Sequence, residues 1–522
     1  MKRTKSDPGS IMVLAWLMAA SFAGAGELYV SPTGAPDGDG SKAKPLGILV
    51  AISDKSPAKP GDTLYLLAGT YNGPMTQDVN RVPQRLPFEV KVSGAPDKPI
   101  RILPAPGAAA HLNGSVAFNA SYVHLIGLDI GDLQWDPWGE KHKTQTALNA
   151  TSGKSMKVIN CNIFGGAMGT GAWQPAVNLE FYGNLIHDFG GMYRDKKDPT
   201  KHNGRGHGHA YYAQNLDGTK IFQHNIAYRG CGWNVHIYTQ EANITGFDVI
   251  ENISYIAGTY VDGQTTDNYL ACGWKPADRI RMNGNVGYQP TMAAAWRANT
   301  RLITLYKPLT NGTGEVCDNY FAGAAYGLSL GAWKSFKVTG NTFWALKYHV
   351  EISSVPTGSA IPTQDQRPTP GNYQVDNNTY IANGNDLSFV YGLQERPGTN
   401  DIISFAAWQK LGFDKNSRMV PGKDGKPAEN KTFVFPNKYA KGRANVGIFN
   451  WEGKDKVEVD LSGALAQGQK YAIYNCLDIK QTIGQAKPVL NGSFDGKPVA
   501  FPLRKDKLSP DFDAFLVAPE LN

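Results

Sequence analysis

The chain has 522 residues, a formal net charge of +7 and only 19% charged residues. This length exceeds what a single compact core usually holds, so we expect a solenoid or several domains. The 58 glycines and 32 prolines indicate a turn-rich, mainly β protein, and the 41% of hydrophobic residues exclude a disordered chain.

The N-terminus has the pattern of a secretion signal. Three basic residues among the first five precede an apolar stretch from Ile11 to Phe22, and Ala23-Gly24-Ala25 fits the small-residue rule for cleavage. We predict a signal peptide over residues 1–25 and a secreted or periplasmic mature protein, with a buried N-terminal helix as the alternative. Cleavage lowers the net charge to +5, which is compatible with an acidic polymer but too weakly basic to indicate nucleic acid.

An asparagine recurs eight times in the same local frame. An apolar residue stands three positions before it and an apolar or β-branched residue follows it, as Phe222 and Ile226 do around Asn225. The pattern predicts strand, turn, strand, and intervals of 22 to 41 residues fit coils with inserted loops. We predict a parallel β-helix over residues 26–385 with the asparagines in one column, and a β-sandwich is the alternative. The eight are Asn162, Asn184, Asn225, Asn252, Asn285, Asn319, Asn341 and Asn378.

Beyond residue 385 the pattern changes. Residues 403–412 predict a short helix within a connecting segment over 386–440. Alternating strands then follow, such as Val446–Trp451, with turn signals such as Asp495-Gly496 between them. We predict a small C-terminal β-domain over 441–522 that caps the solenoid.

The cysteines are odd in number and widely spaced, without a C-x-x-C pair. This spacing predicts buried free thiols rather than a zinc or redox site. No carboxylate cluster has calcium spacing, so we predict no cofactor, and calcium is an unsupported alternative. The cysteines are Cys161, Cys231, Cys272, Cys317 and Cys476.

Two neighbouring predicted coils carry the residues with the most distinctive chemistry. Side chains alternate along a strand, so His236 and Tyr238 point outward if the residues that flank His236 lie in the core. Alignment of the two coils by the glycines that follow them places His209 and Tyr211 beside that pair, also outward. We predict these four as the catalytic residues.

Aromatic and basic residues border this patch. The longest inserted loop, residues 188–206, is basic and ends at the patch, and Arg and Lys neutralise carboxylates. Aromatic side chains suit the apolar faces of sugar rings. A structural ring stack beside solvated loop cations is the alternative. The predicted substrate-binding residues are Trp173, Lys201, Arg205, His207, Trp274 and Lys275.

A His/Tyr patch favours proton abstraction beside a carboxylate, followed by β-elimination or epimerisation. Glycoside hydrolysis usually needs two carboxylates flanking the bond. The outward positions of these two coils carry none, and only residues at strand ends or turns could supply them. These are Asp217, Glu241 and Asp262.

Two stretches of the sequence resemble a known group. Glu27–Gly40 (ELYVSPTGAPDGDG) with the later Pro60-Gly-Asp-Thr and Gly69-Thr-Tyr resembles the start of secreted right-handed β-helix proteins of the pectate-lyase-like superfamily. GHGHAYYAQNLDGTK followed by NIAYRGCGWNVHIY is similar to a branch of that group. The resemblance implies a right-handed, single-stranded solenoid. The superfamily includes polysaccharide lyases, pectin and alginate enzymes, epimerases and some glycosidases.

The first functional hypothesis is therefore a polysaccharide lyase or epimerase that acts on a uronate-containing polymer. The alternatives are a β-helix glycoside hydrolase and a non-catalytic glycan-binding or cell-surface protein. We expect a polysaccharide or oligosaccharide as the partner, no nucleic acid, no membrane span and a monomer.

Overall fold

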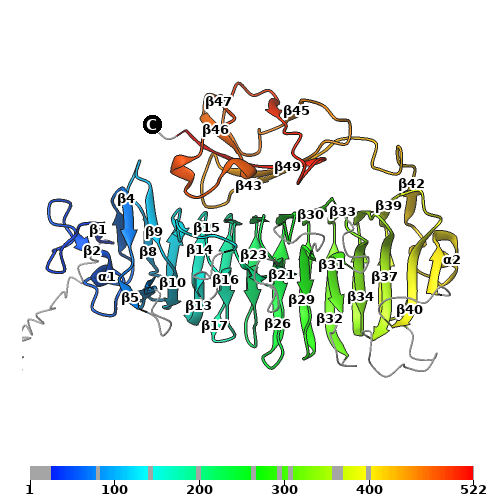
Figure 1. Cartoon of the computed structure of the whole chain (residues 1–522), viewed down its shortest axis with the longest axis horizontal. Helices are drawn as coiled ribbons and strands as arrows, with labels where there is room; N and C mark the ends of the chain where they lie inside the picture. Colours follow the sequence, from blue (N-terminus) through cyan, green and yellow to red (C-terminus); the bar gives the residue numbers. More distant parts are fainter. Residues whose placement is uncertain are drawn as a thin grey trace, which may run out of the picture.

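The computed structural model describes residues 25–77, 83–138, 145–194, 202–259, 266–290, 297–303, 310–355, 368–394 and 401–520. The predicted signal peptide lies outside these ranges except for its last residue. Three long sheets run the length of the main body, and the chain visits them in turn, so that each coil contributes one strand to each sheet (Figure 1). The strands within each sheet are parallel except at the C-terminal end, so the predicted right-handed parallel β-helix is confirmed.

The three sheets are named by the order in which a coil enters them. Sheet 1 consists of β2 (Leu46–Gly47), β1 (Glu27–Ser31), β3 (Thr63–Leu66), β8 (Ile100–Pro104), β11 (Val123–Ile126), β14 (Lys157–Ile159), β18 (Glu180–Tyr182), β23 (Lys220–Gln223), β26 (Ile244–Ile250), β29 (Ala277–Asn283), β32 (Asn311–Cys317), β35 (Trp333–Thr339) and β38 (Tyr373–Asp376).

Sheet 2 follows sheet 1 after a tight turn. It consists of β4 (Gly69–Asn72), β9 (Ala110–Asn113), β12 (Asp129–Gly131), β15 (Asn162–Phe164), β19 (Leu185–His187), β24 (Ile226–Tyr228), β27 (Ile253–Tyr255), β30 (Val286–Gln289), β33 (Tyr320–Gly323), β36 (Thr342–Trp344), β39 (Thr379–Ile381) and β42 (Arg418–Val420).

Sheet 3 completes each coil. It consists of β7 (Phe88–Val90), β10 (Val116–Asn119), β13 (Thr146–Lys154), β16 (Met168–Ala172), β22 (His209–Ala213), β25 (Trp233–Ile237), β28 (Tyr269–Ala271), β31 (Ala298–Ile303), β34 (Tyr326–Gly331), β37 (Tyr348–Val355), β40 (Leu387–Gln394) and β41 (Ile402–Ser404), with β17 (Ala176–Val177) pairing with β13.

The asparagine column lies in the turn between sheets 1 and 2. The Oδ1 of one asparagine accepts hydrogen bonds of 2.7–3.0 Å from the backbone N–H and the Nδ2 of the asparagine one coil earlier, from Asn184 through to Asn378. The residue before each asparagine adopts positive φ, as Gly183 (67°) does. The column therefore satisfies the backbone groups that a tight buried turn leaves without strand partners.

Seven of the eight predicted asparagines belong to this column, and Asn162 does not. Asn162 pairs with Leu185, one position later in the turn, while the backbone N–H of Cys161 donates to the Asn184 Oδ1 at 2.8 Å. The local sequence frame does not distinguish the two positions, because Ile159 and Ile163 flank Asn162 as apolar residues flank the others.

We predict that Asn225→Leu lowers the free energy of unfolding by about 1–3 kcal/mol, because it leaves the backbone N–H of Asn184 and the carbonyl of Phe181 without their partners. Chemical denaturation of the native protein and the variant measures this loss. Asn491→Leu, at an exposed position of an edge strand, is the control and should change stability little. Equal losses for the two variants would contradict a stabilising column.

The stack continues past residue 385, the end expected from the sequence. The strands β40 and β42 extend sheets 3 and 2 with parallel pairing. Short helices lie at both ends of the body, α1 (Ile48–Ala51) at one and α2 (Phe405–Lys410) at the other (Figure 1). The α2 helix confirms the short helix predicted over 403–412, and Trp408, fully buried against Phe389, closes this end of the core.

The C-terminal β-domain has its own antiparallel sheet. Its order is β43 (Lys431–Pro436), β44 (Ala444–Phe449), β49 (Phe512–Pro519), β46 (Lys470–Asn475) and β47 (Leu490–Ser493), beside a pair formed by β45 (Lys456–Val459) and β48 (Val499–Pro502). Between β46 and β47 lie the short 3₁₀ helices η4 (Cys476–Asp478) and η5 (Ile483–Gln485).

This domain lies along the flank of the helix, over sheet 2, and not at the end that the sequence led us to expect (Figure 1). Tyr255 and Tyr288 of sheet 2 pack against Phe512, with ring centroids 5.2 and 5.6 Å apart. Arg229, buried, donates to the carbonyls of Leu477 and Ile479 at 2.9 and 2.8 Å. Aromatic side chains on the outer face of sheet 2 explain this placement, because they would otherwise be exposed.

All five cysteines are buried and free, as predicted. None of the helices in the described ranges is long and apolar enough to cross a membrane.

Candidate functional site

The outer face of sheet 3 carries a row of side chains at the same height in successive coils. Tyr212 of β22 pairs with His236 of β25, and the row continues through Leu270 to Arg301 and Ser329. Neighbouring strands lie about 4.8 Å apart, so these side chains are close neighbours. Core side chains occupy the alternate positions of the same strands, which places this row on the outer face.

Six aromatic and histidine rings gather at the N-terminal part of this row. The His209 and His236 ring centroids lie 4.3 Å apart, and Tyr238 stacks on His236 at 4.8 Å with an interplanar angle of 9°. The Trp233 ring also stacks on His236, with centroids 5.0 Å apart, and the Tyr212 ring stacks on His209 at the same centroid distance of 5.0 Å. We call this group the ring cluster. It comprises Trp173, His209, Tyr212, Trp233, His236 and Tyr238.

Tyr211 is not part of the ring cluster, and the prediction that it faces outward is wrong. It is 1% exposed and packs between Phe181 and Phe222 in the core, with ring centroids 5.3 and 4.7 Å away. Its partner across the strands is Val235, a core residue. The outward tyrosine is its neighbour Tyr212, which the sequence analysis did not select.

The histidines of the ring cluster are held neutral. Burial lowers the pKa of His209 to about 3 and the pKa of His236 well below its ordinary value, and for both rings the positive charge of a neighbour acts in the same direction. Burial raises the pKa of Tyr212, so its phenol stays protonated at neutral pH. Both imidazoles are therefore uncharged at neutral pH, and the Tyr212 phenol keeps a proton that it can donate.

These pKa shifts predict acid sensitivity. In the unfolded chain these histidines bind protons near pH 6.5, whereas in the folded chain they do not. The free energy of unfolding therefore falls as the pH is lowered below about 6.5, by at most about 1.4 kcal/mol per pH unit for each ring. Melting temperatures of the native protein and of His209→Gln across this range measure the effect. The variant should show the shallower slope, and identical slopes would contradict a neutral buried His209.

The predicted binding residues lie around the ring cluster to different degrees. Trp173 belongs to it and donates from its Nε1 to the Asn149 Oδ1 at 2.5 Å. His207 is the last residue of the hairpin strand β21 (His202–His207) and pairs with Gly191 of β20 (Gly191–Arg194). Arg205 lies in the same strand, with its side chain outside the described part, and Lys201 lies outside the described residues.

Trp274 and Lys275 follow the end of β28, in the connection from sheet 3 to sheet 1. The backbone N–H of Trp274 donates to the carbonyl of Thr239, the residue after Tyr238, at 2.8 Å. The Lys275 Nζ lies 3.9 Å from Glu241, whose side chain is 83% exposed. Asp217 is also exposed, and Asp262 is outside the described residues. These placements bring no carboxylate of the hydrolase alternative into the ring cluster among the described residues.

A buried charged group continues the row, and the sequence analysis missed it. The Asp267 carboxylate, fully buried, accepts from the Trp233 Nε1 at 3.3 Å and from the backbone N–H of Ala298 at 2.8 Å. Its Oδ2 lies 3.6 Å from the Arg297 Nη1 and 3.4 Å from the Arg301 Nε. The charged group is thus attached to the ring cluster through Trp233. Its charged members come from two neighbouring coils, and the sequence offers no local pattern that links them.

A second carboxylate lies further along the same face. Glu351, 1% exposed, accepts from the Ser329 Oγ at 2.5 Å, and Ser329 is the cross-strand neighbour of Arg301. Beyond the ring cluster, the outer face of sheet 3 therefore carries two buried carboxylates, Asp267 and Glu351, with Arg301 on a strand between them.

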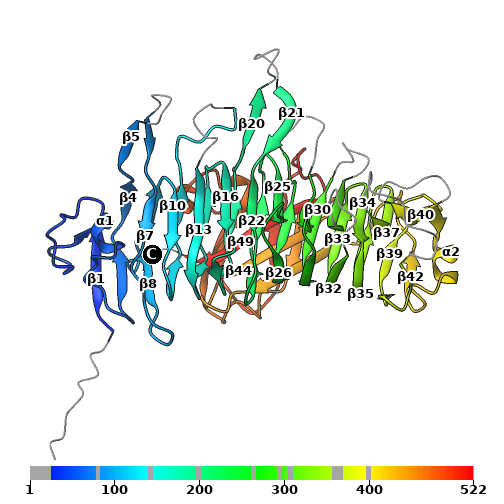
Figure 2. The ribbon, with the colours of Figure 1, turned by 90° about the horizontal axis from the view of Figure 1, so that it is seen from below.

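Long connections flank sheet 3. The β20–β21 hairpin projects from the body beside β22 and β25 (Figure 2). The connections from β27 to β28, from β31 to β32 and from β37 to β38 are also long, whereas from β11 onward the turns from sheet 1 to sheet 2 hold two residues, such as Gly183-Asn184. Inserted connections of this kind carry function more often than tight turns do. The C-terminal domain covers sheet 2, whereas sheet 3 is bordered by these long connections.

Within the described ranges, no group of three or more His, Cys, Asp or Glu side chains is arranged to hold a metal ion.

Comparison with known proteins yields solved structures only. No protein-family model and no curated protein sequence matches the chain. The chain is similar to pectate lyase Pel9A (TM-score 0.43, 13% identity, 66% of this chain and 80% of that one) and to XylC in complex with xylose (TM-score 0.40, 9% identity, 94% and 100%). It is also similar to a mannuronic-acid-specific family 6 polysaccharide lyase from human gut microbiota (TM-score 0.33, 14% identity, 76% and 92%). The three long parallel sheets agree with the fold that the pectate-lyase-like resemblance of the sequence implies.

Proposed function

We propose that the chain is a secreted carbohydrate-active enzyme, a polysaccharide lyase or epimerase that acts on a uronate-containing polymer at the outer face of sheet 3. The observation that carries the proposal is the contact of two neutral histidines, 4.3 Å apart, with the outward tyrosines Tyr212 and Tyr238. The proposal includes the predicted signal peptide and a monomeric enzyme.

The proposed reaction begins with a proton transfer. A neutral imidazole removes the proton from the carbon that bears the uronate carboxylate, and the electron pair of that C–H bond forms the new C=C bond. The C–O bond to the neighbouring sugar breaks, and a tyrosine phenol supplies a proton to the leaving oxygen. In the epimerase variant no C–O bond breaks, and a proton returns to the same carbon from the opposite face.

We assign the base to His236, with His209 as its neighbour, and the acid to Tyr212 or Tyr238. His236 contacts four other rings of the cluster, so its orientation is fixed. Trp173 and Trp233 offer faces on which a sugar ring can stack. The cations predicted from the sequence would neutralise the uronate carboxylate, which makes the proton of the adjacent carbon more acidic. These are Lys201, Arg205, His207 and Lys275, with Trp274 beside them.

Incubation with a panel of polyuronates tests the proposal. Elimination forms an unsaturated uronate, which absorbs in the ultraviolet, and epimerisation in heavy water exchanges a carbon-bound hydrogen for deuterium without that absorbance. Either signal supports the proposal. If the polymer binds but gives no ultraviolet absorbance, no deuterium exchange and no rise in reducing sugar, the chain is a glycan-binding protein instead.

Hydrolysis is the second candidate, and one observation favours it. Asp267 and Glu351 are buried carboxylates on the same outer face as the ring cluster, and paired carboxylates are the usual groups of glycoside hydrolysis. Release of reducing sugar without unsaturated product would support this candidate. Asp267→Asn and Glu351→Gln would then abolish activity while His236→Ala would not.

A further inference from the structure

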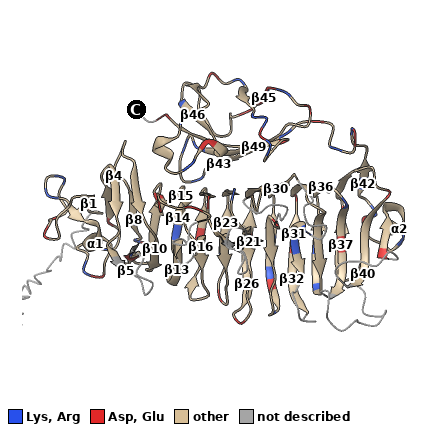
Figure 3. Cartoon of the chain, viewed as in Figure 1, with Lys and Arg blue, Asp and Glu red and all other residues tan. Residues whose placement is uncertain are grey.

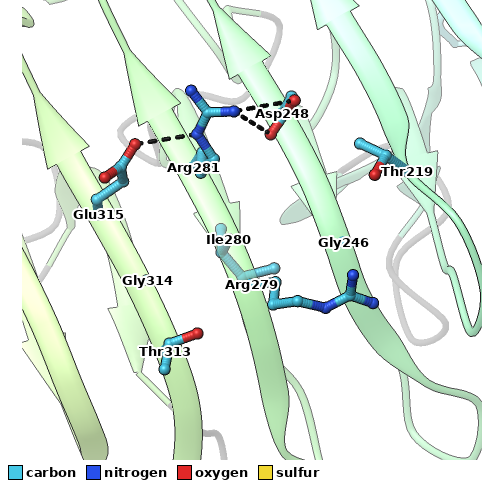
Figure 4. Close-up of a pocket in the computed structure, with 9 residues that line it drawn as sticks. All are labelled: Thr219, Gly246, Asp248, Arg279, Ile280, Arg281, Thr313, Gly314 and Glu315. Atoms are coloured by element: carbon cyan, nitrogen blue, oxygen red, sulfur yellow. Dashed lines mark hydrogen bonds and ion pairs between the residues drawn. The ribbon is translucent and has the colours of Figure 1, made fainter.

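The outer face of sheet 1 carries a groove that the proposed lyase reaction does not use. It has a cavity volume of about 370 Å³ and crosses the middle strands β23, β26, β29 and β32. That volume falls within the range of small-ligand sites. Figure 4 shows the groove between two sets of polar side chains. Its lining consists of Thr219, Gly246, Asp248, Arg279, Ile280, Arg281, Thr313, Gly314 and Glu315.

One wall of the groove is a chain of ion pairs. The Arg281 Nε lies 3.0 Å from the Glu315 Oε1, and its Nη1 lies 3.4 Å from both oxygens of Asp248 (Figure 4). The same Glu315 oxygen also accepts from the Asn283 Nδ2 at 2.7 Å. Arg281 is 51% exposed, so the wall is fixed in position while its donors remain open to solvent.

The other wall depends on Arg279, whose backbone is strained. Arg279 has a φ of 52° within β29, a region that L residues other than Gly, Asn and Asp rarely adopt in a strand. The strand pairing skips this position, since Thr245 pairs with Asp278 and Phe247 pairs with Ile280. The opposite strand skips one residue as well, Gly246 with a φ of 72°, so the register of the pair is kept, and the Arg279 Nη2 donates to the Thr245 Oγ1 at 3.2 Å. Glycine would fit this backbone better, so the arginine is kept at a cost in stability.

The charges that line the groove balance. Two guanidinium groups face two carboxylates, Asp248 and Glu315, and Thr313 adds a hydroxyl. Such a lining offers donors and acceptors to a polyhydroxylated ligand but no net attraction to an anion. None of the nine lining residues is aromatic, so the binding depends on hydrogen bonds and is weak. Figure 3 shows that charged residues of both signs occur on the middle strands of the helix.

We propose that this groove on sheet 1 binds neutral sugar units of a polysaccharide, separately from the uronate site proposed on sheet 3. The groove would hold the protein on a polymer that contains both neutral and acidic sugars while sheet 3 acts on the acidic part. The ligand class follows from the balanced, polar and non-aromatic lining, and the strained Arg279 is the residue on which binding depends.

The test is affinity electrophoresis of the full chain in gels that contain a soluble neutral galactan, mannan or xylan, with polygalacturonate as the anionic comparison. At least one neutral polymer should retard the native protein. Arg279→Gly should weaken that binding about tenfold, the size expected for one lost charged hydrogen bond, while its melting temperature stays equal or rises. A loss of binding in this variant therefore cannot be attributed to unfolding.

Arg101→Ala is the matched control, because Arg101 is an exposed arginine on the outer face of sheet 1 several coils away. It should bind as the native protein does, and so should His236→Ala, which separates this inference from the proposed catalysis. The inference is overturned if no neutral polymer retards the native protein, or if Arg279→Gly binds as tightly as Arg101→Ala. Retardation by polygalacturonate alone, lost in Arg279→Gly, would make the groove an anion site and would also overturn it.

Discussion

Tyr212→Phe and His236→Ala are expected to lower turnover of the true polyuronate substrate by about 10²–10⁴-fold, the usual contribution of a positioned acid or base. Both side chains face outward in the ring cluster, with centroids 5.4 Å apart. The phenol hydroxyl of Tyr212 and one imidazole nitrogen of His236 are the groups that would exchange protons with the substrate. Ultraviolet absorbance of the unsaturated product, measured on each purified variant, gives the loss.

Tyr211→Phe is the matched control for Tyr212→Phe. The two tyrosines are adjacent in sequence, and the substitution removes the same hydroxyl, but the Tyr211 ring lies in the core between Phe181 and Phe222. Its activity should stay close to that of the native protein. Equal loss of activity in the two variants, or loss only in proportion to loss of fold, would show that the ring cluster is structural.

Asp267→Asn is expected to lower the free energy of unfolding by about 3–5 kcal/mol, the usual result of removing one partner from a buried ion pair. Arg297 and Arg301, only 13% and 2% exposed at their side chains, each lose one carboxylate partner, and Trp233 loses its Nε1 acceptor. The shift of the guanidinium-chloride midpoint measures this loss, and tryptophan fluorescence should report the displaced Trp233.

Asp217→Asn is the control for this substitution, because Asp217 is exposed and accepts only from the backbone N–H of Gly218 among the described residues. Its midpoint should stay within the small range typical of surface changes. If Asp267→Asn unfolds at the same midpoint as Asp217→Asn, then the charged group does not hold the outer face of sheet 3 together. Activity measured in parallel tests the hydrolase candidate, which needs this carboxylate.

The coil architecture could be predicted from the sequence because its causes are local. An apolar residue, a tight turn and an asparagine repeat in each coil, and each asparagine needs only the next one to complete its hydrogen bonds, as Asn225 and Asn252 do. The pattern did not reveal a register difference of one residue at the end of the column. Asn162 fits the sequence frame, but Cys161 stands at the column position in the structure. The sequence frame shows where apolar residues recur around each asparagine, but it does not show which side-chain amide faces the next coil.

The ring cluster shows where local pattern stops being sufficient. Tyr212 pairs with His236, 24 residues later, whereas Lys220 pairs with Phe247, 27 residues later, so the turn between sheets 3 and 1 is longer in the second coil. The sequence alignment used Gly218 and Gly246, which lie beyond this turn, and therefore placed the two strands of sheet 3 in the wrong register. The difference is three residues, and any odd shift exchanges the two faces of a strand, which is why Tyr211 was predicted in place of Tyr212.

The sequence by itself determined the repeating coil, the buried cysteines and the nearness of His209 to His236, because each depends on residues within one or two coils. Only the tertiary structure decided that Asp267, Arg301 and Glu351 share a face with them, since stacking brings together residues from coils far apart in the chain. It also decided that the C-terminal domain covers the flank, because the aromatic outer face of sheet 2 appears as a surface only once the coils are stacked.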